Sequence, residues 1–413
     1  MKIRVFERVA SFMKRQERPF KVNMVRAGFQ YFLTCLIQQY QPIYIVGLGA
    51  NPLQLGFVVG IGGIAGAAIS MPAGWLADRY GIRRMFLLGL PLVALGSLIF
   101  ALSPNWLMTI PALLITLLSQ QILMTVCPMV CGRYLRMEER ATGMQMCDTF
   151  SATLGMISPL IAIVIITEFG GLSPDGIRPL YVLQTIGFLL LFLLVLRHYR
   201  DIIAGQTSSR FSGWKGLLGG MGDIFVKGTN VKRWMLYKAL SDVSWFLSLI
   251  YLPLFAAEVK GADQFVLGGM ATASMLLPIL LAIPMGRLAD TVGRKKVIYM
   301  VTPLNSLSIL LLIYATNSTM LLISGVLHGF FTLGFVTEVA ISQELVPTSL
   351  LGTWWGILSL LSGIMGVLGP IFGGLTWSFL GPVYVFLFIL LVETSKITLL
   401  WLSMPETLKV KGT

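Results

Sequence analysis

Four ionisable side chains stand inside long apolar stretches of the sequence, where a charge is costly. These candidates for proton coupling are Asp148, Asp242, Glu338 and His328. A carboxyl or imidazole group in such a place can bind a proton in one conformation and release it in another. Local alternatives stay open. Asp242 could only neutralise Lys238, four residues earlier on the same helix face, and His328 could be a hydrogen-bonded core residue. The face with Asp148 points either into a cavity or at a neighbouring helix.

Other charged residues interrupt the apolar stretches. Arg26 and Lys238 each stand near the start of a long apolar run, where they either extend toward a membrane surface or mark function. Glu393 and Lys396 stand three residues apart on one helix face, which favours an ion pair with a structural role.

Amide and hydroxyl side chains form a second group of candidates. Amides in an apolar medium need a partner or water, and an aqueous cavity that they line would meet that need. Trp245 would add an apolar wall, although tryptophan in such a segment more often packs or anchors. The candidates for a substrate cavity are Gln30, Thr34, Gln38 and Gln41 on one helical face, Gln120 and Gln121 near the middle of a later run, and Trp245.

One short basic pattern occurs twice, at residues 74–84 (GWLADRYGIRR) and residues 286–296 (GRLADTVGRKK). Glycine permits a tight helix end and a close helix approach. Aspartate can accept hydrogen bonds from the free amides at a helix N-terminus, where the helix dipole favours negative charge. The positions that we expect to matter are Gly74, Asp78, Arg79, Gly81, Arg83 and Arg84 in the first copy and Gly286, Asp290, Gly293, Arg294 and Lys295 in the second.

Metal and covalent chemistry find no support in the sequence. The cysteines at positions 35, 127, 131 and 147 have no histidine or carboxylate at ligand spacing, so they are expected to be small buried residues. The two histidines form no set with a nucleophile. We therefore expect no metal, no cofactor and no enzymatic activity.

The composition indicates which elements must position these groups. Of the 413 residues, 56% are hydrophobic and 12% are charged, against about 45–50% and about 25% in soluble domains. A water-soluble surface cannot be built from so few charges, which excludes a soluble enzyme, a nucleic-acid-binding protein and a secreted domain. The sequence predicts a polytopic membrane protein whose spans are helical, because an unpaired backbone amide in lipid costs several kcal/mol.

Charge-free windows predict twelve membrane-spanning helices and an all-α membrane protein. Residues 27–77 hold two spans, separated by a break at 47–52, and residues 85–132 hold two more, separated at 103–105. The others fall near 149–167, 179–196, 234–257, 264–285, 297–315, 319–342, 349–378 and 382–402.

The basic residues predict the orientation. With an even number of spans both termini lie on one side, and the loops and tails of that side carry 26 of the 31 Lys and Arg residues. Cytoplasmic loops are enriched in basic residues. We therefore expect both termini in the cytoplasm, a location in the cytoplasmic membrane, and no nucleic-acid partner despite the net charge of +13.

A shift of 212 residues aligns the first half of the chain with the second, without a gap from Arg26 to Arg84. Arg26 then falls on Lys238 and Gly81 on Gly293. The repeat predicts two pseudo-symmetric six-helix halves, with a substrate path between them near the bilayer midplane. The expected domains are a basic N-terminal segment (1–21), an N-terminal half (22–197), a cytoplasmic linker with an interfacial helix (198–232), a C-terminal half (233–402) and a cytoplasmic tail (403–413).

The repeat also suggests a mechanical role for the basic pattern. Asp78 is expected to accept hydrogen bonds from amides near residues 351–353, at the start of the eleventh span. Asp290 is expected to do the same near residues 141–143, at the start of the fifth. Such latches would tie the halves together on the cytoplasmic side and break when that side opens. The alternative is a solvated aspartate in a loop that only sets the topology.

Both copies of this pattern resemble the cytoplasmic loop signature of the major facilitator superfamily, and the match covers nearly the whole chain. The run Tyr40-Gln-Pro42-Ile-Tyr44 also looks like the end of the first span in drug-exporter-like members. The sequence departs from the family pattern at Ile82 and Thr291, and its fourth span has no arginine. The resemblance implies the two-half fold, a monomer in the lipid bilayer and a cavity lined by spans 1, 4, 7 and 10.

These features predict a secondary active transporter that moves a small, neutral or moderately hydrophobic organic solute by alternating access. Its partners would be that substrate, the bilayer and protons, with proton-coupled efflux as the first hypothesis. An uptake symporter or a uniporter for a small metabolite is the alternative within transport. A membrane ligand sensor without transport is the alternative from another class.

Overall fold

The computed structural model of the chain describes residues 15–135, 140–199, 224–225, 230–347, 350–404 and 406. Within the helices, the side chains of residues 65–75, 77–79, 128, 132–133, 140–142, 282–283 and 351–352 are also outside this description. The expected N-terminal segment up to residue 14, nearly all of the linker with its interfacial helix, and most of the tail lie outside the described residues.

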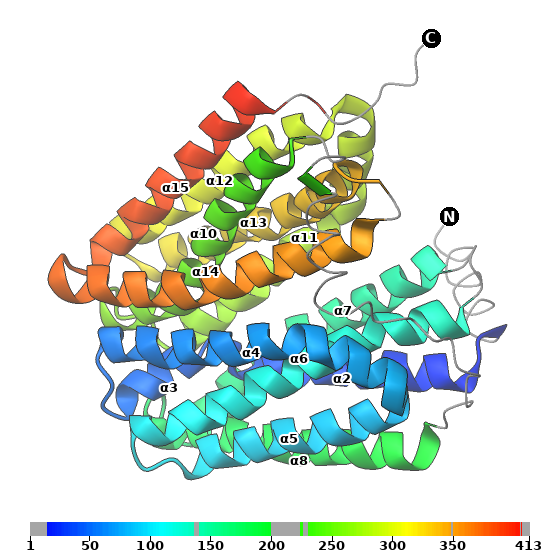
Figure 1. The fold of residues 1–413 in the computed structure, drawn as a ribbon. Coiled ribbons are helices and arrows are strands. Elements are labelled where there is room, and N and C mark those ends of the chain that lie inside the picture. Colours follow the sequence, from blue (N-terminus) through cyan, green and yellow to red (C-terminus); the bar gives the residue numbers. More distant parts are fainter. Residues whose placement is uncertain are drawn as a thin grey trace, which may run out of the picture.

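Twelve long helices and two short ones make up the described chain, which holds no strand (Figure 1). The long helices have 21 to 29 residues, and about 20 residues suffice to cross a bilayer. The first half contains α2 (Arg18–Gln38), α3 (Gln41–Gly47), α4 (Pro52–Tyr80), α5 (Ile82–Leu102), η1 (Trp106–Met108), α6 (Thr109–Tyr134), α7 (Arg140–Glu168) and α8 (Pro174–His198). The second half contains α10 (Val231–Glu258), α11 (Gln264–Val292), α12 (Arg294–Tyr314), α13 (Ser318–Glu344), α14 (Leu351–Phe379) and α15 (Pro382–Ser403).

Ten of these helices are long and apolar enough to cross a membrane. The other two long helices are α2, which carries Arg18, Lys21 and Arg26, and α4, whose described apolar stretch is Pro52–Ile64. The expected all-α, twelve-helix architecture is confirmed.

The first span is not the continuous helix that the charge-free window predicts. It ends at Gln38 and resumes as α3 at Gln41, with Gln39 and Tyr40 in a turn. Pro42 explains the break, because its ring would crowd the carbonyl group of Gln38 and it has no N–H to donate. The expected single helix from residue 27 to 46 is therefore wrong.

Glycines with positive φ separate the helices at both copies of the basic pattern. Gly81, between α4 and α5, has φ +87°, and Gly293, between α11 and α12, has φ +122°. Side chains with a Cβ rarely adopt this conformation. The tight helix end expected at Gly81 is confirmed, and Gly293 in the second copy ends its helix in the same way, whereas Gly74 lies inside α4.

The two halves form two bundles that share one hydrophobic core on a single side. In Figure 1 the first half is the lower bundle and the second half the upper one. We call the side where α2 begins and α15 ends the terminal side. On the opposite side, Tyr40, Leu55, Tyr251 and Phe255 belong to one cluster drawn from both halves. On the terminal side the buried clusters are separate, because each contains residues of one half.

Contacts through glycine bring α4 and α14 together across the halves. A Cβ at Gly56 would overlap the carbonyl oxygen of Pro370, and a Cβ at Gly63 would lie 3.1 Å from that of Gly366. Small residues allow backbones to approach this closely in membrane proteins. At the ends of α7 and α11 on the same side, the Gln264 Nε2 donates to Thr167 Oγ1 over 3.2 Å.

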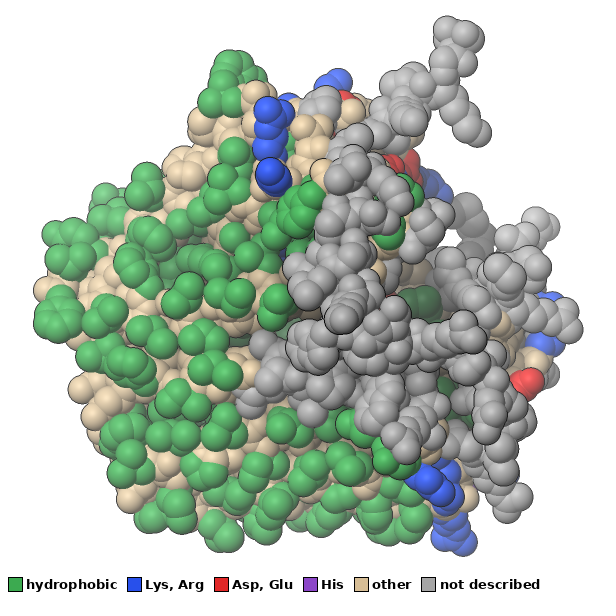
Figure 2. All heavy atoms as spheres, in the orientation of Figure 1, with side chains coloured by type: hydrophobic (Ala, Val, Ile, Leu, Met, Phe, Trp, Pro, Cys, Tyr) green, Lys and Arg blue, Asp and Glu red, His purple; other side chains and the backbone are tan. Residues whose placement is uncertain are grey.

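The outer surface is apolar. Figure 2 shows hydrophobic side chains over most of one face, with Lys and Arg gathered toward the terminal side. Large apolar side chains such as Val164 (62% exposed), Leu190 (60%) and Leu391 (60%) stand outward. Exposed apolar area on this scale suits lipid rather than water, so the chain is an integral, multi-pass membrane protein.

Candidate functional site

A buried ion cluster joins α10 to α13 in the C-terminal half. The Lys238 Nζ lies 2.8 Å from Asp242 Oδ1 and 3.4 Å from Glu338 Oε2. Lys238 and Asp242 are 8% and 5% exposed. The predicted neutralisation of Lys238 by Asp242 is therefore present, and Glu338 joins the pair from another helix.

Glu338 also accepts two hydrogen bonds from hydroxyl groups of α10. Both end on Oε1, from Tyr237 Oη at 3.0 Å and from Ser241 Oγ at 2.8 Å. Donors directed at one carboxylate stabilise its charged form. The polar run from Tyr237 to Ser244 in an apolar span was the sequence signal for these hydroxyl groups, and our sequence analysis missed it.

A second buried ion pair lies on α15. The Lys396 Nζ is 3.1 Å and 3.2 Å from the two carboxylate oxygens of Glu393, as their spacing predicts. Ser244 Oγ on α10 donates to Glu393 Oε1 over 2.5 Å. The ammonium group also stands 5.6 Å from the ring centroid of Tyr237.

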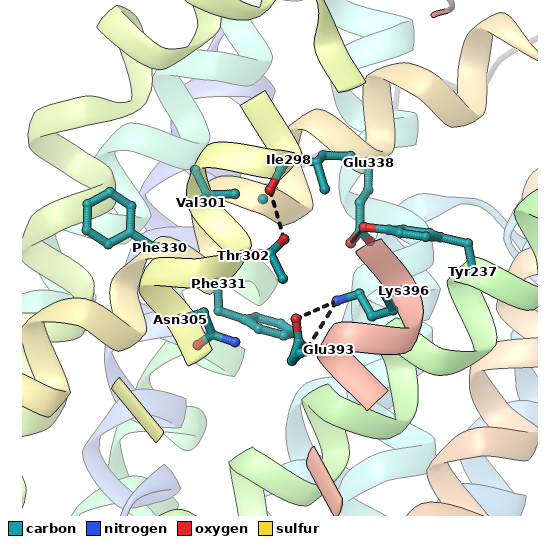
Figure 3. Close-up of a pocket in the computed structure, with 11 residues that line it drawn as sticks. Tyr237, Ile298, Val301, Thr302, Asn305, Phe330, Phe331, Glu338, Glu393 and Lys396 are labelled. Carbon is teal, nitrogen blue, oxygen red and sulfur yellow. Dashed lines mark hydrogen bonds and ion pairs between the residues drawn. The ribbon is translucent and has the colours of Figure 1, made fainter. Parts of the chain in front are cut away.

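A small polar cavity lies between these pairs and α12. Figure 3 shows Tyr237 and Glu338 directed toward one another, with Lys396 bonded to Glu393 nearby. The cavity measures about 10 Å³, which is room for about one water molecule. Both amide atoms of Asn305 are buried in its wall without a hydrogen bond among the described residues. A water molecule there would have polar partners.

The N-terminal half buries its equivalent basic residue with no ion pair to an acid that the structure describes. Arg26 is 1% exposed, so of the two alternatives the one in which it extends to the membrane surface is excluded, as it is for Lys238. Its Nε and Nη2 donate to Asn23 Oδ1 over 3.1 and 2.9 Å, and its Nη1 donates to Gln30 Oε1. The guanidinium carbon stands 4.3 Å from the ring centroid of Phe86.

The break in the first span divides the four polar side chains that the sequence predicts on one helical face. Gln30, Thr34 and Gln38 share one face of α2, whereas Gln41 belongs to α3. Its expected position on the same helical face is therefore wrong. The Gln30 side chain accepts a hydrogen bond from Arg26, and Thr34 Oγ1 donates to the Gln30 backbone carbonyl over 3.0 Å.

The remaining cavity candidates are only partly covered. Gln38, Gln120 and Gln121 are half-buried, and their amides form no hydrogen bond within the described part of the chain. Asn23 Nδ2 donates to Cys127 Sγ over 3.5 Å, which joins α2 to α6. Trp245 is 37% exposed and stacks on Phe331 of α13, with ring centroids 5.5 Å apart.

Two of the proton-coupling candidates stand apart from the ion cluster. Asp148 is exposed on α7 and forms no ion pair within the described ranges. His328 stacks on Phe331 at 5.9 Å, and its Nδ1 is buried without a hydrogen bond to any described residue. The alternative in which His328 is a hydrogen-bonded core residue therefore lacks a partner for Nδ1 among the described residues.

The first copy of the basic pattern is only partly described. At Gly74, Asp78 and Arg79 only the helical backbone is described. Arg83 Nη2 donates to the Leu196 carbonyl over 2.9 Å, and Arg84 is exposed. The Asp78 latch thus stays a prediction.

In the second copy the aspartate faces outward. The Asp290 side chain is 70% exposed and lies 3.8 Å from Arg294 Nη2, which also contacts Glu344 Oε1 at 3.0 Å. A Cβ at Gly286 would meet open space. The amides of Arg294 and Lys295 donate to Glu406 Oε1 over 3.0 and 3.4 Å.

The match to known proteins follows the same two-half division. A family model described as Major Facilitator Superfamily matches residues 24–263 and again residues 234–412. The chain belongs to the major facilitator superfamily. Its members are membrane transporters, and this chain has their two-bundle fold.

Curated relatives share short stretches of this transporter. It is 31% identical over 147 residues to "Putative multidrug resistance protein MdtD" of Salmonella typhi, covering 32% of this chain and 28% of that protein. It is 36% identical over 81 residues to the protein of the same name in Serratia proteamaculans, covering 18% and 17%. The matched stretches span less than a third of these relatives.

Solved structures are similar over nearly the full length. A mutant of the nucleoside transporter NupG has a TM-score of 0.78 at 15% identity and covers 93% of this chain and 99% of its own. A D-xylose–proton symporter has a TM-score of 0.70 at 14% identity and covers 94% and 97%. At these identities the likeness extends to the fold alone.

Proposed function

We propose that this protein is a secondary active transporter of the cytoplasmic membrane that exports a small, neutral or moderately hydrophobic organic solute in exchange for protons. Membership of the superfamily supports transport, and the stretches shared with proteins named for multidrug resistance favour export. The termini are cytoplasmic in this proposal, because the basic residues gather on the terminal side.

The proposed substrate class rests on glutamine side chains of α2 and α6 whose amides have no hydrogen-bond partner among the described residues. Gln38 and Gln120 are half-buried and free of hydrogen bonds to the described residues, so each can offer a donor and an acceptor to a neutral solute. Met124 on α6 is 67% exposed and Tyr31 on α2 is 43% exposed. Amides beside such apolar groups suit a solute with both characters.

A strongly charged substrate fits these groups less well. Arg26, the basic residue of α2, is covered by Phe86 and two amide side chains, so it has no exposed surface for an anion. The carboxylate cluster of the C-terminal half supports coupling to protons, because groups of this kind bind and release them.

The packing supports a conformation that is closed on the side opposite the termini. One core joins the halves there, whereas the clusters on the terminal side are separate. With cytoplasmic termini this arrangement is the inward-facing state of an alternating-access cycle.

Two linked measurements test the proposal. Purified protein would first be screened against neutral and weakly basic organic compounds for a ligand-induced rise in melting temperature. Each hit would then be followed in proteoliposomes with an imposed pH gradient. Movement of the hit against its gradient, with opposite movement of protons, is the expected result.

Other outcomes would replace it. Transport in the same direction as protons would indicate an uptake symporter, and transport indifferent to pH would indicate a uniporter. Ligand binding with no movement in any gradient would indicate a sensor.

A further inference from the structure

The described core of the C-terminal half buries more acidic than basic groups. Lys238 and Lys396 are 8% and 3% exposed, and Asp242, Glu338 and Glu393 are 5%, 4% and 1% exposed. Glu393 and Lys396 form a pair of their own. Two carboxylates, those of Asp242 and Glu338, are left to share the one ammonium group of Lys238. A buried charge without a partner is costly, and a carboxylate avoids that cost by binding a proton.

The N-terminal half supports a role for these acids beyond packing. The repeat aligns Arg26 with Lys238 and Gln30 with Asp242. Arg26 is buried with the amides of Asn23 and Gln30 and the ring of Phe86. Among the described residues this buried cation is accommodated without a carboxylate, so the acids beside Lys238 exceed what the burial of a cation here requires.

The hydrogen bonds distinguish the two acids. Glu338 accepts from Tyr237, Ser241 and Lys238, and three donors favour the ionised form. Asp242 accepts a hydrogen bond from Lys238 to Oδ1, its Oδ2 is buried without one among the described residues, and the Ser362 hydroxyl of α14 lies beside this carboxylate. We propose that Asp242 carries one exchangeable proton beside an ionised Glu338 and a charged Lys238.

Proton release then changes the net charge of the three groups. With Asp242 protonated, the lysine and the glutamate balance and the group is neutral. When the O–H bond of Asp242 breaks, the electron pair stays on its carboxylate and the proton passes to water. The group is left with one negative charge. The use of this proton in coupling rests on the proposed proton-driven export, whereas the proton itself can be measured without transport.

The surroundings of the cluster contain both apolar side chains and further titratable groups. Phe335 of α13 is 46% exposed, and its ring centroid lies 4.7 Å from Lys238 Nζ, so it covers the ammonium group at the edge of the bundle. The α14 helix, packed on α10, presents the Ser362 hydroxyl toward Asp242. Among the other titratable groups, Tyr237 donates to Glu338 and has Tyr299 of α12 and Glu393 and Lys396 of α15 near it, whereas His328 of α13 stacks on Phe331 and stands apart.

Infrared spectroscopy of the purified full-length protein in lipid, at neutral pH, tests for this proton. The wild type should show the C=O stretch of a protonated carboxyl group, shifted in D2O, and Asp242→Asn should remove it. Asp175→Asn, which neutralises an exposed acid, is the matched control and should leave the band unchanged. Lys238→Met should about double the band, because both remaining carboxylates then lack a cation.

A conservative exchange keeps the test decisive if Asp242→Asn fails to accumulate. Asp242→Glu should change the frequency of the band, and Glu338→Asp should not. A wild type without the band, or a band that only Glu338→Asp or Asp148→Asn alters, would overturn the assignment.

Transport measurements separate this site from the proposed function. If the band depends on Asp242 but transport ignores the pH gradient, the proton site stands and the proposed coupling fails. If proton-driven export occurs without the band, the coupling stands and this site fails.

Discussion

Replacing Gly56 with alanine is expected to loosen the contact between α4 and α14 and to populate the state that opens on the side opposite the termini. The added Cβ would overlap the carbonyl oxygen of Pro370 and lie 3.0 Å from Tyr251 Oη. Because the main obstacle is backbone, it cannot be relieved by a side-chain rotation. The helix must move away.

The size of the effect follows from the cost of overpacking. Forcing extra methyl groups into a packed contact costs about 1–3 kcal/mol, and each 1.4 kcal/mol is about a tenfold change in an equilibrium constant. The gain in helix propensity from glycine to alanine is common to both conformations and cancels. The closed-to-open ratio should therefore fall by about 5- to 150-fold.

Gly356 provides the matched control on α14 itself. A Cβ there would meet open space in this conformation, so Gly356→Ala should leave the ratio unchanged. The assay is the distance between spin labels at Leu107→Cys and Phe379→Cys, both exposed on the side opposite the termini, after the four native cysteines are replaced. Gly56→Ala should add a population at longer distance. Identical distance distributions for the wild type and Gly56→Ala would refute the assignment of this contact as the closed gate.

Three further predictions test separate parts of the protein. Asp78→Asn should remove a charge-assisted contact at a helix terminus and shift the conformational balance by about 1–2 kcal/mol, and unchanged cysteine accessibility on the terminal side would exclude a latch. Gln38→Ala or Gln120→Ala should weaken substrate binding by about 1–2 kcal/mol without lowering the melting temperature. If a cysteine at either position never reacts with a hydrophilic thiol reagent, these amides are buried packing groups. Lys396→Met should destabilise the protein by about 3–5 kcal/mol because it leaves Glu393 buried without a cation, and the double variant with Glu393→Gln should recover much of that loss, as denaturation in detergent can measure.

The sequence predicts well those features that are decided within one helix. The spacing of Glu393 and Lys396, and of Lys238 and Asp242, was enough to pair them, because residues three or four apart share a helix face. Pro42 indicates the break in the first span, but a window defined only by the absence of charged residues takes no account of proline.

Contacts between helices could not be predicted in the same way. Glu338 meets Lys238 because of how α13 and α10 are rotated against each other, and about 100° of rotation separates successive residues of a helix. The burial of Arg26 under Phe86 depends in the same way on the packing of α5. Composition carries little information about such rotations.

The capping of α12 by Glu406 affects how this protein can be handled. The end of α15 and the chain after it are fastened at three points, because Arg233 Nη1 donates to the Ser403 carbonyl over 2.7 Å and Lys295 Nζ donates to the Met404 carbonyl over 2.6 Å, in addition to the contacts of Glu406. The end of α15 is thus anchored to α10 and α12. A truncation that removed residues 403–406 would remove these contacts, whereas a purification tag or fluorescent reporter fused beyond Glu406 is expected to leave them in place.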